Sequence, residues 1–259
     1  MNRKSVCILI ILLAACFSAC SRYDETTAAE QPREAVPAAD LIRQADELFK
    51  QREDLKNMRE AIALLKRARF ADDKNFEAAW KLSQFSYFLG TDTTDEKESA
   101  KAFTDGIAAG ATAARIAPDK PEGYFWQAAC YGGEAERSPF TKGIAAVDKI
   151  RDLMQKVVAI DPKFQNSMAY DALAVIELKT SFYGGKPEKA VEYLEKGLEV
   201  SPDNFAMRLH LAEAFLALER KPEAKKQLEL VLKIKPSAEV ALEYEKTQKQ
   251  ARKMLESKF

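Results

Sequence analysis

The sequence has 259 residues, with ten glycines and ten prolines, and its 40 basic residues balance its 40 acidic ones. So few glycines and prolines argue against a turn-rich all-β fold. The apolar content of 47% is too high for a disordered chain, and zero net charge argues against a global field that attracts nucleic acid. A single histidine excludes chemistry that needs several histidines.

The first 20 residues have the layout of a secretion signal. Arg3 and Lys4 precede an apolar run over residues 6–15, and small residues beside cysteines follow. This run is too short for a bilayer core of about 30 Å, which needs about 20 apolar residues. We therefore expect a cleaved signal peptide over residues 1–19 rather than a transmembrane helix.

Small residues before a cysteine resemble the lipobox of bacterial lipoproteins, and the pattern occurs before both Cys16 and Cys20. We favour Cys20 as the lipid attachment site because Ser21 is a usual second residue of a mature lipoprotein, and Cys16 is the alternative. Several acyl chains would anchor the protein stably. The resemblance implies a bacterial envelope, and the lack of Asp after the cysteine favours the periplasmic side of the outer membrane. An ordinary signal with incidental cysteines is the competing interpretation.

Residues 20–40 are polar, contain two prolines and have no apolar period, which is typical of a flexible tether. Residues 41–238 instead have apolar residues three and four apart, as helices do. Pro202 and Pro236 are 34 residues apart, the length of a tetratricopeptide (TPR) unit. Three earlier marks, Asp73, Pro118 and Pro162, give spacings of 45, 44 and 40 residues up to Pro202, so the second, third and fourth units are longer. These patterns predict an all-α, TPR-like helical-hairpin solenoid of about five repeats, several of them elongated.

We expect the extra residues of the long units to lie mainly between the two helices of each unit. Local signals favour that placement: Leu89-Gly90, Gly132-Gly133 and Gly184-Gly185 to end first helices, Thr93 with Glu96 as a capping box, and Pro187 to open a second helix. Residues 239–259 continue the helical period with one apolar stripe, and we expect them to form a capping helix that closes the solenoid.

Catalytic motifs are absent: the sequence has no phosphate loop, GxGxxG, HExxH or CxxC. We expect Cys130 to be a buried small hydrophobic residue and His210, which has no partner for metal binding, to be packed or solvated. The sequence thus predicts no enzyme activity, no catalytic residue, no metal and no cofactor.

A solenoid offers a groove lined by the first helix of each unit. Aligning the unit ends places five residues on that wall: Trp80, Tyr87, Phe125, Leu209 and Leu216. Such a wall could hold an apolar ligand or a peptide segment. The competing interpretation is that these side chains pack against neighbouring helices.

Three segments carry a resemblance to a known family: residues 123–133 (GYFWQAACYGG), 184–196 (GGKPEKAVEYLEK) and 201–214. With the lipoprotein start and the elongated units, the chain resembles the TRAP transporter T-component (TatT) family over about residues 40–235. The resemblance implies a lipid-anchored periplasmic scaffold that docks the solute-binding protein of a TRAP transporter and assists transfer of a small organic or hydrophobic solute. It implies no catalytic residue.

Two other functions compete with that expectation. One is a general TPR protein-interaction adaptor in bacterial envelope assembly, and the other is a solute-binding lipoprotein that acts without a protein partner. The sequence leaves the solute and the oligomeric state open, including a homo-oligomer.

Overall fold

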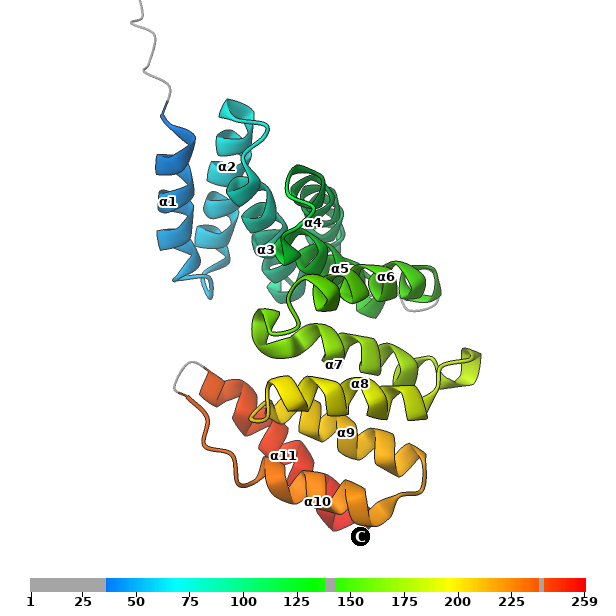
Figure 1. The fold of residues 1–259 in the computed structure, drawn as a ribbon. Coiled ribbons are helices and arrows are strands. Elements are labelled where there is room, and N and C mark those ends of the chain that lie inside the picture. The colour runs from blue at the N-terminus through cyan, green and yellow to red at the C-terminus, as the bar shows by residue number, and fades with distance from the viewer. Residues whose placement is uncertain (1–35, 138–142, 238–239) are drawn as a thin grey trace, which may run out of the picture. The chain divides into compact units, whose positions relative to one another are not determined.

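The structure is a computed structural model that describes residues 36–137, 143–237 and 240–259 (Figure 1). Within these ranges the chain forms eleven α-helices, one short 3-10 helix and no strand. The helices are α1 (Ala38–Phe49), α2 (Leu55–Ala71), α3 (Phe76–Asp92), α4 (Glu96–Ile116), α5 (Pro121–Arg137), α6 (Ile144–Ile160), α7 (Phe164–Lys179), η2 (Ser181–Tyr183), α8 (Pro187–Val200), α9 (Phe205–Ala217), α10 (Lys221–Val231) and α11 (Ala241–Lys258). The predicted all-α class is confirmed.

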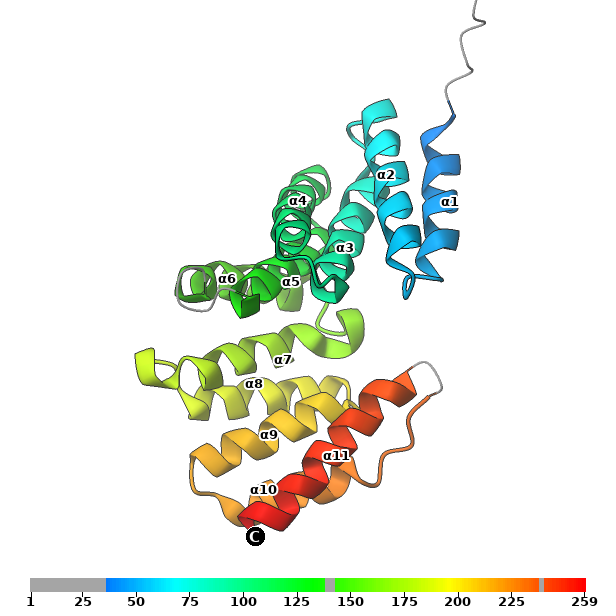
Figure 2. The same ribbon diagram turned by 180° about the vertical axis from the view of Figure 1, so that it is seen from behind.

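The first ten α-helices form five consecutive pairs, from α1 with α2 to α9 with α10. Four of the five predicted unit ends directly follow the second helix of a pair: Asp73, Pro118, Pro162 and Pro202 lie just beyond α2, α4, α6 and α8. The fifth, Pro236, lies five residues beyond the end of α10. Helix α11 packs on α9 and α10, and Figure 2 shows it lying across this last pair. The five predicted repeats and the helix that closes the array are thus confirmed.

Residues 36–259 form one compact unit. Helix α1 begins at Ala38, within the predicted tether, and α11 begins at Ala241, close to the predicted boundary at residue 239. The predicted signal peptide, Cys16, Cys20 and most of the tether lie outside the described residues.

Side-chain caps fix where the first helices of the second and fifth pairs begin. The Asn75 side chain accepts a hydrogen bond from the Ala78 backbone N–H at 2.9 Å, and Asn204 accepts one from Met207 at 3.0 Å. Each cap satisfies an amide that the helix itself leaves without a partner and contributes about 1 kcal/mol. The same residue type therefore starts equivalent helices far apart in the sequence.

The extra residues of the second unit lie in its helices, so the prediction that they lie in the turn is wrong there. Helices α3 and α4 have 17 and 21 residues, whereas α9 and α10 of the fifth unit have 13 and 11. The turn between α3 and α4 spans only residues 93–95. In the fourth unit the prediction holds in part, because residues 180–186 form a long turn there.

Two of the predicted glycine stops are also wrong. Helix α3 continues through Gly90 to Asp92, and α5 continues through Gly132 and Gly133 to Arg137. Gly90 and Gly133 instead make room for the ring of Phe103 from α4, which a β-carbon at either position would meet. Glycine at these two positions therefore serves packing between helices rather than helix termination.

The capping box predicted at Thr93 and Glu96 is replaced by a cap at the residue directly before α4. The side chain of Asp95 accepts hydrogen bonds from the backbone N–H groups of Lys97 and Glu98. Thr93 instead donates its hydroxyl to the Glu98 carboxylate at 2.6 Å. Gly184, which we expected to end the first helix of the fourth unit, instead ends the 3-10 helix η2 with a left-handed φ of 104°, because α7 already ends at Lys179. Pro187 lies in the first turn of α8 as predicted.

Helix α4 approaches α3 and α5 closely at two glycines one turn apart. A β-carbon at Gly106 would lie 2.5 Å from Cys130 Sγ on α5, and one at Gly110 would lie 2.7 Å from Gln127 Cβ. The hydroxyl of Ser83 on α3 donates to the Gly106 carbonyl at 2.8 Å. In the opposite direction, the hydroxyl of Ser99 on α4 donates a hydrogen bond to the carbonyl of Gly90 on α3 at 2.6 Å. Small residues thus let the three helix backbones come within reach of one another's polar groups.

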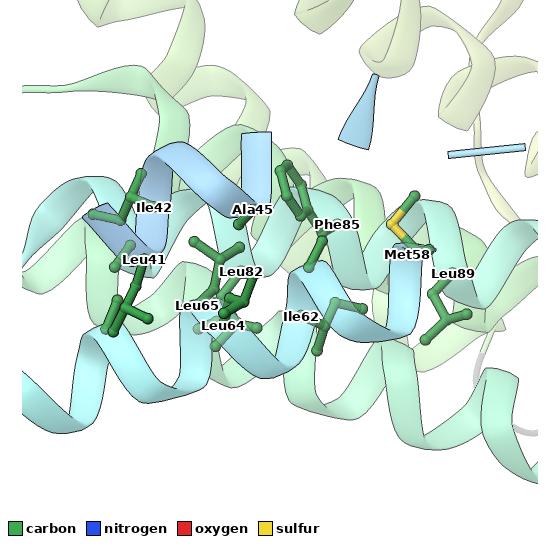
Figure 3. Close-up of a cluster of buried hydrophobic side chains, with 14 of the residues drawn as sticks. Leu41, Ile42, Ala45, Met58, Ile62, Leu64, Leu65, Leu82, Phe85 and Leu89 are labelled. Atoms are coloured by element: carbon green, nitrogen blue, oxygen red, sulfur yellow. The ribbon is translucent and has the colours of Figure 1, made fainter. Parts of the chain in front are cut away.

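Apolar side chains form three buried clusters along the array. Figure 3 shows the first, in which Leu41 and Ala45 of α1 meet Leu65 of α2 and Phe85 of α3. The second cluster joins α7 to α11, and the third joins α5, α6 and α7. Truncating a fully buried leucine such as Leu65 to alanine costs about 2–5 kcal/mol.

The start of α7 is irregular, because Gln165, Asn166 and Ser167 have φ values of 48°, 55° and 64°. Left-handed backbone costs about 1–2 kcal/mol for each residue that is not glycine. Two hydrogen bonds hold the turn: Ser201, at the end of α8, pairs with the buried Ser167 hydroxyl at 2.8 Å, and Asn204, at the start of the next unit, donates to the Asn166 carbonyl at 2.8 Å. The right-handed part of α7 therefore begins only after this turn.

We predict opposite effects on stability for alanine at two glycines. Gly106→Ala should lower the free energy of unfolding by about 1–3 kcal/mol, because its methyl group overlaps Cys130. Gly132→Ala should raise it by about 0.5–1 kcal/mol, because Gly132 lies inside α5 with open space around it and alanine favours helix. Urea unfolding of both variants measures these values. Equal effects at the two glycines would contradict the close packing of α4.

Candidate protein-interaction surface

Aromatic rings connect the first helices of four successive units. Phe49 of α1 contacts Phe88 of α3 with ring centroids 5.4 Å apart, and Phe88 contacts Trp126 of α5 at 5.9 Å. Trp126 meets Phe125 at 5.1 Å, and Phe125 meets Phe164 of α7 at 5.3 Å. We call this series the aromatic ladder. It spans three boundaries between units, so the first helices of four units share one series of ring contacts.

The five predicted groove residues occupy two kinds of environment. Phe125 and Leu209 are 5% and 4% exposed and pack inside the apolar clusters of the array. Trp80, Tyr87 and Leu216 are half-buried at the edges of those clusters. The contact of these residues with a ligand or partner stays a prediction, and the structure adds that three of the five retain accessible surface.

Tyr87 and Trp80 lie beside the aromatic ladder. The Tyr87 ring contacts both Phe88 and Trp126, at 5.4 and 5.8 Å. Burial raises the pKa of Tyr87, and the nearby charge of Glu136 adds to the rise, so this phenol stays protonated at neutral pH. A protonated phenol and an apolar ring at the same place suit a peptide, which offers carbonyl acceptors and apolar side chains.

Charged groups border the ladder at its amino-terminal end. Lys81 Nζ is 2.6 Å from both Asp46 of α1 and Glu77 of α3, and it lies 5.6 Å from the Trp80 ring centroid. The Arg52 guanidinium lies 5.2 Å from the centre of the Phe49 ring. Burial opposes the charge on Lys81, but the two carboxylates outweigh it and raise the pKa of Lys81. The aromatic surface thus has a permanently charged rim.

Trp126 has a feature that sequence reasoning missed. Its indole Nε1 is buried and has no hydrogen-bond partner among the described residues. Burying such a donor without an acceptor costs about 1–3 kcal/mol. No pattern in the sequence signals this, because the environment of the indole is set by helices α3 and α5 together.

Cys130 is fully buried in α5, as predicted. Its sulfur lies 3.6 Å from the Ser83 carbonyl oxygen of α3. Burial raises the pKa of Cys130 to about 12. The thiolate needed for nucleophilic chemistry is therefore not populated near neutral pH, and the residue acts in packing.

His210 of α9 forms a hydrogen bond that the sequence did not reveal and that becomes an ion pair when the imidazole is protonated. Its Nδ1 lies 2.7 Å from Asp171 Oδ1 of α7, and the Asp171 residue is only 7% exposed. Burial by itself lowers the pKa of His210, but the hydrogen bond and the charge of Asp171 raise it by more. The nearby Glu213 also raises this pKa, and Lys179 lowers it. The two partners are 39 residues apart and belong to successive units, which only the fold brings together.

Two properties of the described residues bear on other functions. No helix among them is long and apolar enough to cross a membrane. Within the same ranges, no group of three or more His, Cys, Asp or Glu side chains is arranged to hold a metal ion.

Comparison with known families identifies the chain. The family model described as regulator of microtubule dynamics protein 1-3 matches residues 41–170, half of the chain. The chain belongs to this family. A tetratricopeptide repeat model matches residues 182–242 of this regulator of microtubule dynamics family member, which confirms the repeat assignment at its carboxy-terminal end. Neither model is that of the T-component family, which the sequence resembles. No curated protein shows a significant match.

Solved structures of TPR proteins share the fold of this family member. The TPR protein TTC0263 of Thermus thermophilus is 18% identical with a TM-score of 0.59, and the match covers 83% of this chain and 98% of that one. PilF of Pseudomonas aeruginosa is 14% identical with a TM-score of 0.58, over 85% of this chain and 90% of its own. A MamA fragment from Desulfovibrio magneticus is 14% identical with a TM-score of 0.57, over 76% and 94%. At these identities the likeness concerns the fold.

We predict that His210 makes stability depend on pH. Its pKa in the folded protein lies above the ordinary value of 6.5, so the protonated ring favours the folded state. This stabilisation is complete below about pH 6.5 and is lost as pH rises through the folded pKa. The difference in unfolding free energy between the wild type and His210→Gln should therefore shrink as pH rises from about 6 to 9.

The same pair can be tested directly, because His210 is the only histidine in the sequence and gives one set of ring signals by NMR. Asp171→Asn should bring the pKa of His210 below its wild-type value, since burial remains while the negative charge is gone. An unchanged titration in Asp171→Asn would show that the pair does not form in solution.

Proposed function

We propose that the protein is a TPR adaptor that binds a protein partner along the first helices of its units. The observation that carries this proposal is the aromatic ladder, in which Phe88 is half-buried, together with the half-buried Trp80 and Tyr87 beside it. Large rings anchor protein partners at low cost in conformational entropy, because they have few rotatable bonds. The TPR fold, which typically presents such surfaces for protein binding, supports the same conclusion.

An adaptor role also agrees with the chemistry of the described residues. The buried thiol of Cys130 is protonated, and the imidazole of His210 is held by Asp171. Neither group is paired with a second side chain in a way that activates a nucleophile. Partner binding therefore accounts for the accessible features of the surface more completely than catalysis does.

A narrower form of the proposal is that the partner is the solute-binding protein of a TRAP transporter. Its support is the resemblance of residues 123–133 and 184–196 to the T-component family. The broader adaptor role has the additional support of the fold, so it is the conclusion we favour.

Site-specific photocrosslinking tests the adaptor role. The photoreactive amino acid p-benzoylphenylalanine at Tyr87 should give a protein adduct in cells that carry the full chain. The same amino acid at Phe70 is the matched control, because Phe70 is an aromatic residue of the second helix α2 and is 94% exposed. We expect a discrete adduct at position 87 and none, or a diffuse set, at position 70. Adducts of equal yield at both positions would count against binding along the first helices.

Mass spectrometry of the adduct at position 87 identifies the partner class. A periplasmic solute-binding protein would support the TRAP association, and a secretion or outer-membrane assembly protein would support the general adaptor. An apolar small molecule that copurifies with the chain, in the absence of any protein adduct, would favour the solute-binding lipoprotein.

We also propose that Cys20 anchors the chain by lipid to the periplasmic side of the bacterial outer membrane. The support is the double lipobox pattern over residues 13–20 and the serine at position 21. Cys20→Ser should abolish incorporation of an alkyne-labelled fatty acid, and Cys16→Ser should leave it unchanged. The reverse result would assign the anchor to Cys16, and labelling of both variants would contradict a single attachment site.

A further inference from the structure

The turn between α7 and α8 presents two aromatic side chains to solvent. Phe182 and Tyr183 are 96% and 79% exposed, although they are adjacent members of the 3-10 helix η2. Only Phe70 has a comparably exposed large apolar side chain among the described residues. Two exposed rings contribute almost no buried apolar area to the stability of the fold. An adjacent pair of them therefore indicates a contact with another molecule.

Backbone hydrogen bonds and a glycine define the conformation of the turn that carries this pair. The Thr180 carbonyl accepts hydrogen bonds from the Tyr183 amide at 2.7 Å and from the Gly185 amide at 3.0 Å. Gly184 supplies the left-handed φ of 104° that lets the chain reverse after the aromatic residues. A rigid turn loses little conformational entropy when its side chains bind.

A buried carboxylate ties the turn to its neighbours. Glu177 is 4% exposed, and its carboxylate accepts a hydrogen bond from the Lys186 amide at 3.0 Å and lies 3.5 Å from the Arg151 guanidinium of α6. The two ends of the turn are therefore linked to each other and to the preceding unit. The backbone that carries the aromatic pair is therefore anchored on both sides.

Lysines flank the pair on both sides. Lys179 precedes it and pairs with Glu136 of α5 at 3.0 Å. Lys186 and Lys189 follow it, both exposed and without an ion pair to any described residue, and Glu188 is the one exposed acid between them. Lysine side chains beside an aromatic pair can reach headgroup phosphates while the rings enter the boundary of the acyl region.

We propose that the aromatic pair and Lys186 and Lys189 form a contact with a bilayer surface that carries anionic headgroups. A bilayer fits this turn better than a protein does. The Phe182 ring is 96% exposed, so a protein partner would need a deep matching pocket to bury it, whereas lipid adapts to the shape of the ring. Tyrosine and phenylalanine are suited to the interfacial depth, and each flanking lysine gains from the negative surface potential. This contact is independent of both the lipid anchor and the partner surface on the first helices.

Vesicle flotation of residues 36–259 tests the proposal without the anchor. This segment contains all three apolar clusters and forms one compact unit, so it folds by itself, and circular dichroism verifies that for each variant. The wild-type segment should float with vesicles of mixed phosphatidylcholine and phosphatidylglycerol and much less with phosphatidylcholine alone. The double variant Phe182→Ser with Tyr183→Ser should lose about tenfold or more in partitioning.

Two further variants separate the contribution of the lysines to vesicle binding from that of exposed aromatic residues in general. Lys186→Gln with Lys189→Gln should lower binding to the anionic vesicles by about tenfold and leave the weak binding to phosphatidylcholine unchanged. Phe70→Ser is the matched control, because it removes an equally exposed aromatic residue beside Asp72 and Asp73, and its binding should equal that of the wild type. Absence of wild-type flotation, or equal flotation of the aromatic double variant, would overturn the proposal. If the chain does not bind vesicles and p-benzoylphenylalanine at position 183 crosslinks a protein, the aromatic pair contacts a protein and the membrane proposal is wrong.

Discussion

The close approach of α4 to α3 and α5 is the constraint on which the amino-terminal three units depend. Glycine at positions 106 and 110 removes the side chains that would otherwise separate the helices. The hydroxyl groups of Ser83 and Ser99 then donate to carbonyls of the opposite helix. These hydrogen bonds form within a buried interface, where an unpaired hydroxyl would be costly, so each favours one register of α4 along α3.

This register decides where the large side chains go. The ring of Phe103 fills the space left by Gly90 and Gly133, which places it between α3 and α5. The rings of Tyr87, Phe88 and Trp126 then meet between the same two helices and continue the aromatic ladder. The tight packing of small residues and the aromatic surface are thus two consequences of one helix arrangement. The long α3 and α4 fit this arrangement, because added helical turns extend the paired surface without altering its register.

The carboxy-terminal units share the apolar cluster that joins α7 to α11, and polar contacts add to it. Asp171 and His210 join α7 to α9 by a partly buried hydrogen bond, and Asn204 and Ser201 hold the left-handed turn at the start of α7. Polar groups therefore reinforce the apolar contacts between the fourth and fifth units. The exposed aromatic pair at residues 182 and 183 lies on the turn between α7 and α8, whose far end is hydrogen-bonded to Glu177.

The sequence by itself determined the repeat, its five units and the places where successive units meet, because these depend on local chemistry: proline cannot continue a helix, asparagine caps its start, and Gly184 allows the left-handed turn before α8. It also predicted the burial of Cys130 from the apolar residues around it in α5. Only the tertiary structure decided that Gly90 and Gly133 serve packing rather than helix termination, since a glycine inside a helix and one at its end look alike in sequence. The Asp171–His210 pair and the unpartnered Trp126 indole likewise depend on how closely helices from different parts of the chain approach. That distance is set by the side chains of both helices at once, which no local pattern records.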